Sequence, residues 1–388
     1  MPRALKIEEC LWVRSPNSEH PIFRPITAAL EARGAQTFSL KMKAGHESLP
    51  KLKEILWKTD KHVILHGLLP GELHAIKPIL AERKNFSMAL IDWWTSPWWY
   101  TRHAEYLLFN LYNGIAIRKG LATFGNGFKA PLLSAPEMMI PFHIASSILR
   151  LPALVAAPFR EMMQRRRREL DNRDPQRLLY FPISSNTSDV PSWTPAPDEY
   201  DFSNTGATYG IWHMRDAYAP ARYDFANIYK DREALIDGIK KFENAPYKVF
   251  DRRGRARLTW PEYCRTVQRS RYAIATGGVH EASIPKYLEY VCLGTPVLGR
   301  PLPYEYPLLR SCIFTVDALH LSPAQLKAKL DEALAAQPRL RENCLAVREQ
   351  VIKLYDSQAI LDLLQAQLDG KPIPTDYVSI SAPHGAGR

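Results

Sequence analysis

The first half of the chain alternates short apolar segments with amphipathic ones. Apolar runs at 7–14, 62–67 and 86–92 are typical of buried β-strands. The segments 26–34 and 72–84 repeat apolar residues every three or four positions, which predicts helices. Strands that alternate with helices in this way predict a parallel sheet with helices on both faces.

A second alternating series occupies the other half of the chain. We expect its strands at 178–184, 200–207, 247–251, 271–277, 295–300 and 312–317. Helical patterns fall between them at 231–244 and 260–270, and a longer helical stretch covers 322–369. The pattern therefore predicts the α/β class, with two Rossmann-like, doubly wound domains.

The chain has 388 residues, which suits two domains because a single hydrophobic core rarely grows beyond about 250–300 residues. We expect an N-terminal domain at 1–178 and a second domain at 179–345. A C-terminal helix at 346–370 should then pack back. The remaining residues, 371–388, are rich in Pro, Gly and Ser and predict a flexible tail.

The net charge is +11, from 51 Lys and Arg against 40 Asp and Glu. This net positive charge is compatible with binding to nucleic acid, to an anionic membrane or to phosphorylated small molecules, and it does not distinguish among these partners. Basic residues are scattered through both halves and cluster densely only at 165–168, which argues against a dedicated nucleic-acid face. A basic nucleic-acid-binding protein nevertheless stays open as the alternative class.

The cysteines indicate a reducing compartment. There are five of them, an odd number with no closely spaced pair, which argues against a disulfide framework and a zinc knuckle. The N-terminal residues 1–13 are too short and too polar for a signal peptide. We therefore expect a cytoplasmic protein.

Two segments bear on a membrane surface. The apolar stretch 138–159 contains His143 and Arg150 and is a poor transmembrane span, but Arg165–Arg168 follow it closely. This combination predicts either a helix on an anionic membrane or a core helix with a solvated basic end. The loop "DWWTSPWWY", 92–100, fits either buried packing or contact with a sugar or lipid acceptor.

The most informative stretch begins where the strand 271–277 ends. Gly277 and Gly278 permit a sharp turn, and Ser283 is a plausible N-cap for a helix at 284–292. The free N–H groups at such a helix start, together with the helix dipole, bind phosphate. The two carboxylates that flank this site, Glu281 and Glu289, could each accept hydrogen bonds from pairs of sugar hydroxyls. The ligand predicted here is a nucleotide sugar.

The sequence "HEASIPKYLEYVCLGTPVLG", residues 280–299, resembles the donor-binding motif of GT-B glycosyltransferases and of their exostosin-like and spore-coat branches. That motif has two glutamates separated by seven residues and then a "GTPV" strand; the matching residues are Glu281, Glu289, Gly294, Thr295, Pro296 and Val297. The segment 200–218 resembles the first strand and loop of the same domain. The resemblance implies two domains that face a cleft, with the acceptor in the N-terminal one and the donor in the other.

The resemblance also implies roles for individual residues. Glu281 would face the sugar as a catalytic residue, Glu289 would bind the ribose, and Arg215, with His213 second, would meet the diphosphate. The remaining donor-site residues are expected around the glycine turn and the helix start, and they are Gly277, Gly278, His280, Ser283 and Ile284.

Two further catalytic candidates lie in the N-terminal half. An inverting enzyme needs a general base, and His20 follows the first strand. Asp92 ends another strand and could orient an acceptor hydroxyl, with helix capping as the equal alternative. No Asp-x-Asp pair occurs, which favours a reaction without a metal or other cofactor.

The sequence thus predicts a metal-independent glycosyltransferase of glycan or cell-envelope biosynthesis. It would move a sugar from a nucleoside-diphosphate sugar to a hydroxyl of a glycan, lipid-linked or protein acceptor, with an anionic membrane surface as a further partner. A glycosyltransferase that modifies nucleic acid is the second alternative. Whether the sugar's configuration is retained or inverted stays open.

Overall fold

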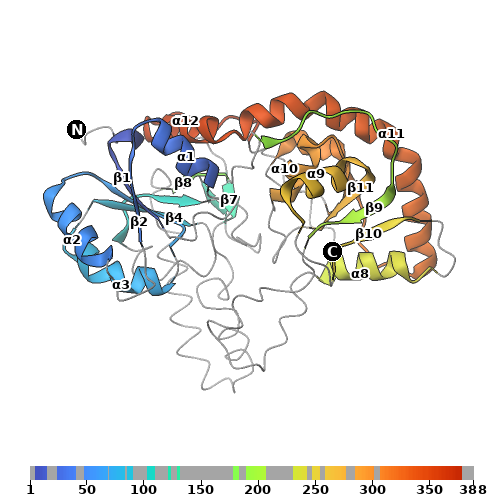
Figure 1. Ribbon diagram of the computed structural model, residues 1–388, viewed down its shortest axis with the longest axis horizontal. Helices are drawn as coiled ribbons and strands as arrows, with labels where there is room; N and C mark the ends of the chain where they lie inside the picture. The colour runs from blue at the N-terminus through green and yellow to red at the C-terminus, as the bar shows by residue number, and fades with distance from the viewer. Residues whose placement is uncertain are drawn as a thin grey trace, which may run out of the picture. The chain divides into compact units, whose positions relative to one another are not determined.

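The computed structural model describes residues 5–14, 24–40, 48–68, 70–83, 85–90, 103–109, 121–123, 129–131, 178–182, 189–206, 230–242, 247–253, 258–276, 285–300 and 306–377. The chain forms two compact units (Figure 1). Unit 1 comprises Met1–Ser185 and Tyr355–Pro374, and unit 2 comprises Asn186–Leu354 and Thr375–Arg388.

Unit 1 contains a parallel sheet with the strand order β2-β1-β3-β4-β5-β8. Its strands are β1 (Leu11–Arg14), β2 (Gln36–Ser39), β3 (Val63–His66), β4 (Phe86–Leu90), β5 (Leu107–Phe109) and β8 (Leu178–Tyr180). A short antiparallel pair is formed by β6 (Leu121–Thr123) and β7 (Lys129–Pro131). Because the main strands are parallel, their carboxyl ends meet at one edge, and the order reverses at β1 as in doubly wound sheets.

Helices cover both faces of this sheet, with α1 and α12 on one side and α2 and α3 on the other (Figure 1). Their bounds are α1 (Arg24–Ala32), α2 (Ser48–Lys58), α3 (Pro70–Ala81) and α12 (Ser357–Leu368), and a 3-10 turn, η1 (Ile7–Glu9), precedes β1. Trp12 of β1 and Leu30 of α1 share a buried core with Leu361 and Leu364 of α12. The helix α12, the last one in the described part of the chain, thus completes the core of the first unit.

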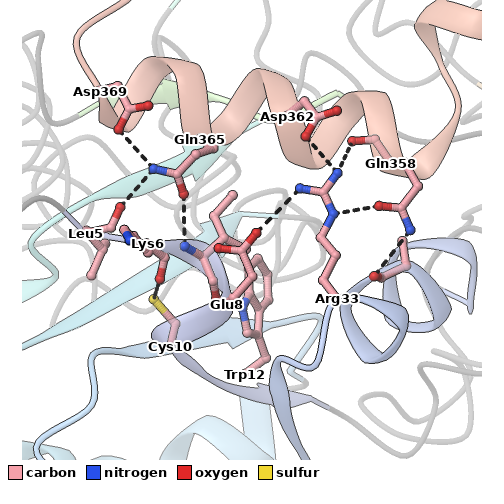
Figure 2. Close-up of polar contacts among 12 residues, drawn as sticks. Leu5, Lys6, Glu8, Cys10, Trp12, Arg33, Gln358, Asp362, Gln365 and Asp369 are labelled. Carbon is pink, nitrogen blue, oxygen red and sulfur yellow. Dashed lines mark hydrogen bonds and ion pairs between the residues drawn. The ribbon is translucent and has the colours of Figure 1, made fainter.

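Polar contacts fix α12 against the start of the chain (Figure 2). Arg33 donates from Nε to Oε1 of Gln358 at 2.6 Å and from Nη2 to Oδ1 of Asp362 at 2.7 Å. The side chain of Gln365 accepts from the backbone N of Ile7 at 2.9 Å and donates to the carbonyl of Leu5 at 3.1 Å. One side-chain amide therefore satisfies two backbone groups that the sheet does not pair.

We expect Gln365→Ala to lower the free energy of unfolding by about 1–3 kcal/mol, because it leaves the backbone groups of Leu5 and Ile7 without their partner. Urea denaturation measures this difference. The exposed glutamine Gln350 of α11 is the matched control, and Gln350→Ala should change stability by less than about 0.5 kcal/mol. Equal effects of the two substitutions would contradict the role given to Gln365.

Unit 2 contains a second parallel sheet with the order β10-β9-β11-β12-β13. Its strands are β9 (Tyr200–Asn204), β10 (Val249–Asp251), β11 (Ser270–Ala275), β12 (Val297–Gly299) and β13 (Ile313–Thr315). The helices are α8 (Lys230–Lys240), α9 (Trp260–Gln268), α10 (Pro285–Cys292) and α11 (Pro323–Leu354), with a 3-10 turn, η9 (Pro307–Cys312). Phe202, Leu235, Ile274 and Leu298 belong to its buried core.

Local sequence explains where the helices of unit 2 begin and end. Before α9, the backbone N–H of Thr259 donates to the carboxylate of Glu262 at 2.8 Å, which is half of a capping box. After α10, Gly294 takes a left-handed backbone conformation with φ of 75°, which glycine adopts without strain. The chain can therefore turn directly from α10 into β12.

The predicted fold class, two Rossmann-like α/β units, is confirmed. One strand was assigned to the wrong sheet. The run at 178–184 was predicted to start the second series, but β8 pairs with β5 and forms the edge of the first sheet. Leu179 and Phe181 bury their side chains in the core of unit 1, so the units divide between Ser185 and Asn186 rather than at 178.

Candidate functional site

Of the predicted site residues, the structure describes only Glu289, on α10. The others lie outside the described residues, and they are His20, Asp92, His213, Arg215, Gly277, Gly278, His280, Glu281, Ser283 and Ile284. The segment 138–168 and the tryptophans of 93–99 also lie outside the described residues. Glu289 and its neighbours therefore define the candidate site.

The carboxyl end of β9 is shaped by Asn204, which is fully buried. Its amide Nδ2 donates to Oδ1 of Asp251, at the end of β10, and its Oδ1 accepts from the backbone N of Gly206, each at 3.2 Å. The asparagine thereby ties two neighbouring strand ends together and fixes the turn that follows β9.

Two cationic side chains lie beside this turn. A Cβ atom at Gly206 would lie 2.5 Å from Nη1 of Arg232 and 3.4 Å from Cε of Lys286. Arg232 is in the first turn of α8, and Lys286 is the second residue of α10. Each of these helices follows a strand of the parallel sheet, so each begins at the carboxyl edge, where the helix dipole favours anions. The absence of a side chain at Gly206 allows the two cations to approach the backbone.

Glu289 lies one helical turn after Lys286 and contacts α9. The hydroxyl of Tyr263 donates a short hydrogen bond to Oε2 of Glu289. The ammonium of Lys286 lies 4.6 Å from the centroid of the Tyr263 ring. The hydroxyl of Tyr290 lies 2.8 Å from Oγ1 of Thr205, just after β9. The carboxylate, the lysine and the end of β9 thus belong to one connected cluster.

The tyrosines of this cluster keep their protons at neutral pH. Burial, followed by the charge of Glu289, raises the pKa of Tyr263 well above its usual value. Burial also raises the pKa of Tyr290, and the hydrogen bond with Thr205 only partly offsets this. Both hydroxyls are therefore neutral and able to donate.

A further polar group lies at the end of the neighbouring strand. Thr276 follows β11 and is 4% exposed, and its Oγ1 has no hydrogen-bond partner among the residues that the structure describes. A buried hydroxyl usually has a partner. Thr276 also directly precedes the predicted glycine turn at 277–278, so the candidate site extends along this edge of the sheet.

Asp251 anchors the same edge through several hydrogen bonds. It accepts from Lys240, from Nε of Arg253 at 2.8 Å and from the backbone N of Arg253 at 3.0 Å, in addition to Asn204. Burial alone would raise the pKa of Asp251, but these hydrogen bonds outweigh it and lower the pKa to about 2. Asp251 is therefore ionised at neutral pH and serves the structure of the site.

This lowered pKa predicts a dependence of stability on pH. The pKa of Asp251 in the folded protein lies below the ordinary aspartate value of 3.8, so the stabilisation is fully present above about pH 4 and is lost as pH falls toward about 2. We expect the free energy of unfolding to fall more steeply between about pH 4 and pH 2 in the wild type than in Asp251→Asn. Parallel curves, measured by urea denaturation at each pH, would contradict this assignment.

The carboxyl edge of the first sheet carries Arg14 and His66. His66 is buried, with its ring edge-to-face against Trp12 at 5.9 Å and Phe181 at 6.0 Å between centroids. Burial, helped by the charge of Arg14, lowers the pKa of His66 to about 3. A neutral, buried histidine suits a structural role.

Within the described part of the chain, no three His, Cys, Asp or Glu side chains gather closely enough to hold a metal ion. The predicted metal independence stays a prediction. Among the helices that the structure describes, none is both long enough and apolar enough to cross a membrane.

Comparison with known proteins bears on the fold. No protein-family model and no curated protein sequence matches this chain. A glycosyltransferase from Rickettsia africae is similar in structure, with a TM-score of 0.50 and 10% identity over 94% of this chain and 100% of that one. The fold is the GT-B fold.

Other solved structures are more distant. HepE from Anabaena, in complex with UDP and glucose, gives a TM-score of 0.47 and 8% identity over 93% of this chain and 100% of that one. Sucrose-phosphate synthase from Thermosynechococcus elongatus gives a TM-score of 0.47 and 15% identity over 93% of this chain and 98% of that one. At these identities the likeness concerns the fold, and at that level the resemblance predicted from residues 280–299 is confirmed.

Three residues of the candidate site were missed by sequence reasoning. Lys286 lies inside the recognised motif, Arg232 is in the first turn of the helix after β9, and Tyr263 is on a separate helix. The position of Lys286, three residues before Glu289 on one helix, was a usable signal because such residues share a helix face. Nothing in the sequence links Tyr263 to Glu289, since their contact depends on how α9 packs beside α10.

Proposed function

We propose that the protein is a glycosyltransferase that moves a sugar from a nucleoside-diphosphate sugar to an acceptor hydroxyl. The observation that carries the proposal is the placement of Arg232 and Lys286 beside Gly206, with Glu289 one helical turn beyond Lys286. Paired cations beside a glycine at the carboxyl edge of a parallel sheet suit a diphosphate. A carboxylate at the next turn suits the hydroxyls of the ribose.

In the proposed reaction, the bond between the sugar's anomeric carbon and the diphosphate oxygen breaks. A new bond forms to the acceptor oxygen, and the acceptor hydroxyl loses its proton. Negative charge develops on the departing nucleoside diphosphate. Arg232 and Lys286 would stabilise that charge, and fixed cations are effective here because they need little reorganisation during the reaction.

The roles of the residues that would contact the transferred sugar, the phosphates and the acceptor rest on the sequence alone. We propose Glu281 at the transferred sugar, with the glycine turn at 277–278 and Arg215 or His213 at the phosphates. His20 is proposed as the base of an inverting reaction, and Asp92 as a group that orients the acceptor.

Three broader proposals also rest on the sequence. The reaction is proposed to need no metal, and the acceptor is proposed to be a glycan, a lipid-linked glycan or a protein of the cell envelope. The enzyme is proposed to work in the cytoplasm, where the basic segment 165–168 could attach it to an anionic membrane.

Release of nucleoside diphosphate from a panel of nucleotide sugars tests the reaction, and equilibrium binding tests the site. We expect Glu289→Ala to cost roughly 1.5–3 kcal/mol of binding, or about 10- to 150-fold in Kd for the nucleoside diphosphate. Glu332 of α11 is an exposed control that pairs with Lys329, and Glu332→Ala should leave Kd unchanged. The absence of both turnover and nucleotide binding with every donor would overturn the proposal.

A further inference from the structure

Tyr263 makes the one hydrogen bond to the Glu289 side chain recorded among the described residues, and its direction is fixed. A carboxylate can only accept, and the tyrosine hydroxyl keeps its proton at neutral pH, so Tyr263 donates to Oε2. Tyr263 is buried at 8% exposure, whereas Glu289 is only partly buried. The donor therefore comes from the interior of unit 2, and the acceptor reaches toward its surface.

The ring of Tyr263 is held by three neighbouring side chains. It stacks against Trp260 with 5.3 Å between centroids and against Tyr290 with 6.4 Å. The ammonium of Lys286 lies over the same ring. A tyrosine has only two side-chain torsions, and these contacts leave its hydroxyl little freedom. The position of the hydroxyl is thus set before any ligand binds.

This arrangement has a consequence for the carboxylate. Glu289 has three side-chain torsions, and a solvated glutamate would lose rotamer freedom on binding a ligand. When Tyr263 holds Oε2, that loss has already occurred in the free protein, which is how preorganisation improves affinity. The second oxygen, Oε1, is the one left to accept from a ligand.

We infer that Tyr263 is a positioning residue of the nucleotide site, which holds one oxygen of Glu289 so that the other faces the ribose hydroxyls of the donor. The inference rests on the proposed function for the identity of the ligand. It adds a role for α9, whose residues the donor-binding motif at 280–299 does not include.

A purely structural role for the Tyr263 hydroxyl makes a different prediction. Loss of a hydrogen bond that only maintains the shape of this site should weaken all its ligands alike, whereas loss of positioning should act on the ribose contact. The ratio of Kd values for a 2′-deoxynucleoside diphosphate and its ribose counterpart isolates this contact. The probe is the pair of ribonucleoside and 2′-deoxynucleoside diphosphates that carries the base to which the wild type binds most tightly.

The test compares Tyr263→Phe with the wild type by calorimetric titration. The substitution removes one oxygen and keeps the ring stacks. We expect Kd for the ribonucleoside diphosphate to rise about 5- to 10-fold, Kd for the 2′-deoxy analogue to rise less, and the ratio to shrink by at least about threefold. Tyr272→Phe is the matched control, because this buried tyrosine donates to the carbonyl of Ala333 at 2.5 Å, and it should change neither value.

A double variant covers the case in which the carboxylate, left without its donor, prevents folding. Tyr263→Phe/Glu289→Ala removes the carboxylate together with its partner. We expect its Kd to equal that of Glu289→Ala alone, because positioning has no effect once no acceptor remains at position 289. A further several-fold loss in the double variant would overturn the inference.

The outcomes separate the two proposals. If Glu289→Ala binds nucleoside diphosphates as tightly as the wild type, the proposed ribose contact fails and the inference fails with it. If Glu289→Ala weakens binding and Tyr263→Phe does not, or weakens ribose and deoxyribose ligands equally, only the role of Tyr263 is overturned.

Discussion

Gly299→Ala should prevent unit 2 from folding. Gly299 ends β12 and pairs with Ala275 of β11. A Cβ atom at Gly299 would lie 1.7 Å from the carbonyl oxygen of Ala275 and 2.6 Å from its carbonyl carbon. These are backbone atoms of the central strands, so no side-chain rotation can relieve the overlap, and the strands would have to separate.

The expected cost of Gly299→Ala exceeds about 5 kcal/mol, beyond the range of most single substitutions. Soluble expression and circular dichroism measure the outcome, and we expect an insoluble or largely unfolded variant. Gly34→Ala is the control. Gly34 has φ of 75° with open space around it, so alanine there should cost only about 1–2 kcal/mol from backbone strain. A folded Gly299→Ala variant of near-normal stability would show that β11 and β12 are not paired as described.

Lys286→Met should abolish most of the affinity for nucleoside diphosphates. The ammonium of Lys286 is proposed to contact the diphosphate, and both groups carry full charge. We expect a loss of about 3 kcal/mol, or roughly 150-fold in Kd. Affinity for the corresponding nucleoside should change little, since it has no phosphates. Calorimetric titration with both ligands measures the difference.

Lys248→Met is the matched control for this substitution. Lys248 is exposed and immediately precedes β10, so it lies at the opposite edge of the same sheet. Its replacement removes the same charge from unit 2 without touching the candidate site. Equal losses in the two variants would assign the effect to net charge and would contradict a local phosphate contact.

The sequence predicts those parts of the fold that local pattern determines. The run Val63–His66 is fully buried, and its apolar pattern predicted a strand. The strand Gln36–Ser39 is half-exposed and mixes polar with apolar residues, so it carried no clear pattern. In the lysine-rich helix Ser48–Lys58, the buried residues are Leu52 and Leu56. The sequence pattern did not predict this helix either.

Tertiary contacts account for the remaining differences. The apolar pattern at 178–184 correctly indicated a strand, but the choice of sheet depends on its partner β5, which the pattern cannot specify. The motif at 280–299 led directly to Glu289. Arg232 and Tyr263 reach the same edge of the sheet from other helices, and only the packing of α8 and α9 brings them there.

The central claim is that the carboxyl end of the second sheet binds a nucleoside diphosphate. Thermal unfolding of the purified protein with uridine, guanosine and thymidine diphosphates tests it most directly. We predict that at least one of them stabilises the wild type, by about 2.7 kcal/mol at 100 times its Kd, and that Lys286→Met loses this effect while Lys248→Met keeps it. No stabilisation by any of the three at millimolar concentration, or the same stabilisation in Lys286→Met as in the wild type, would contradict the account.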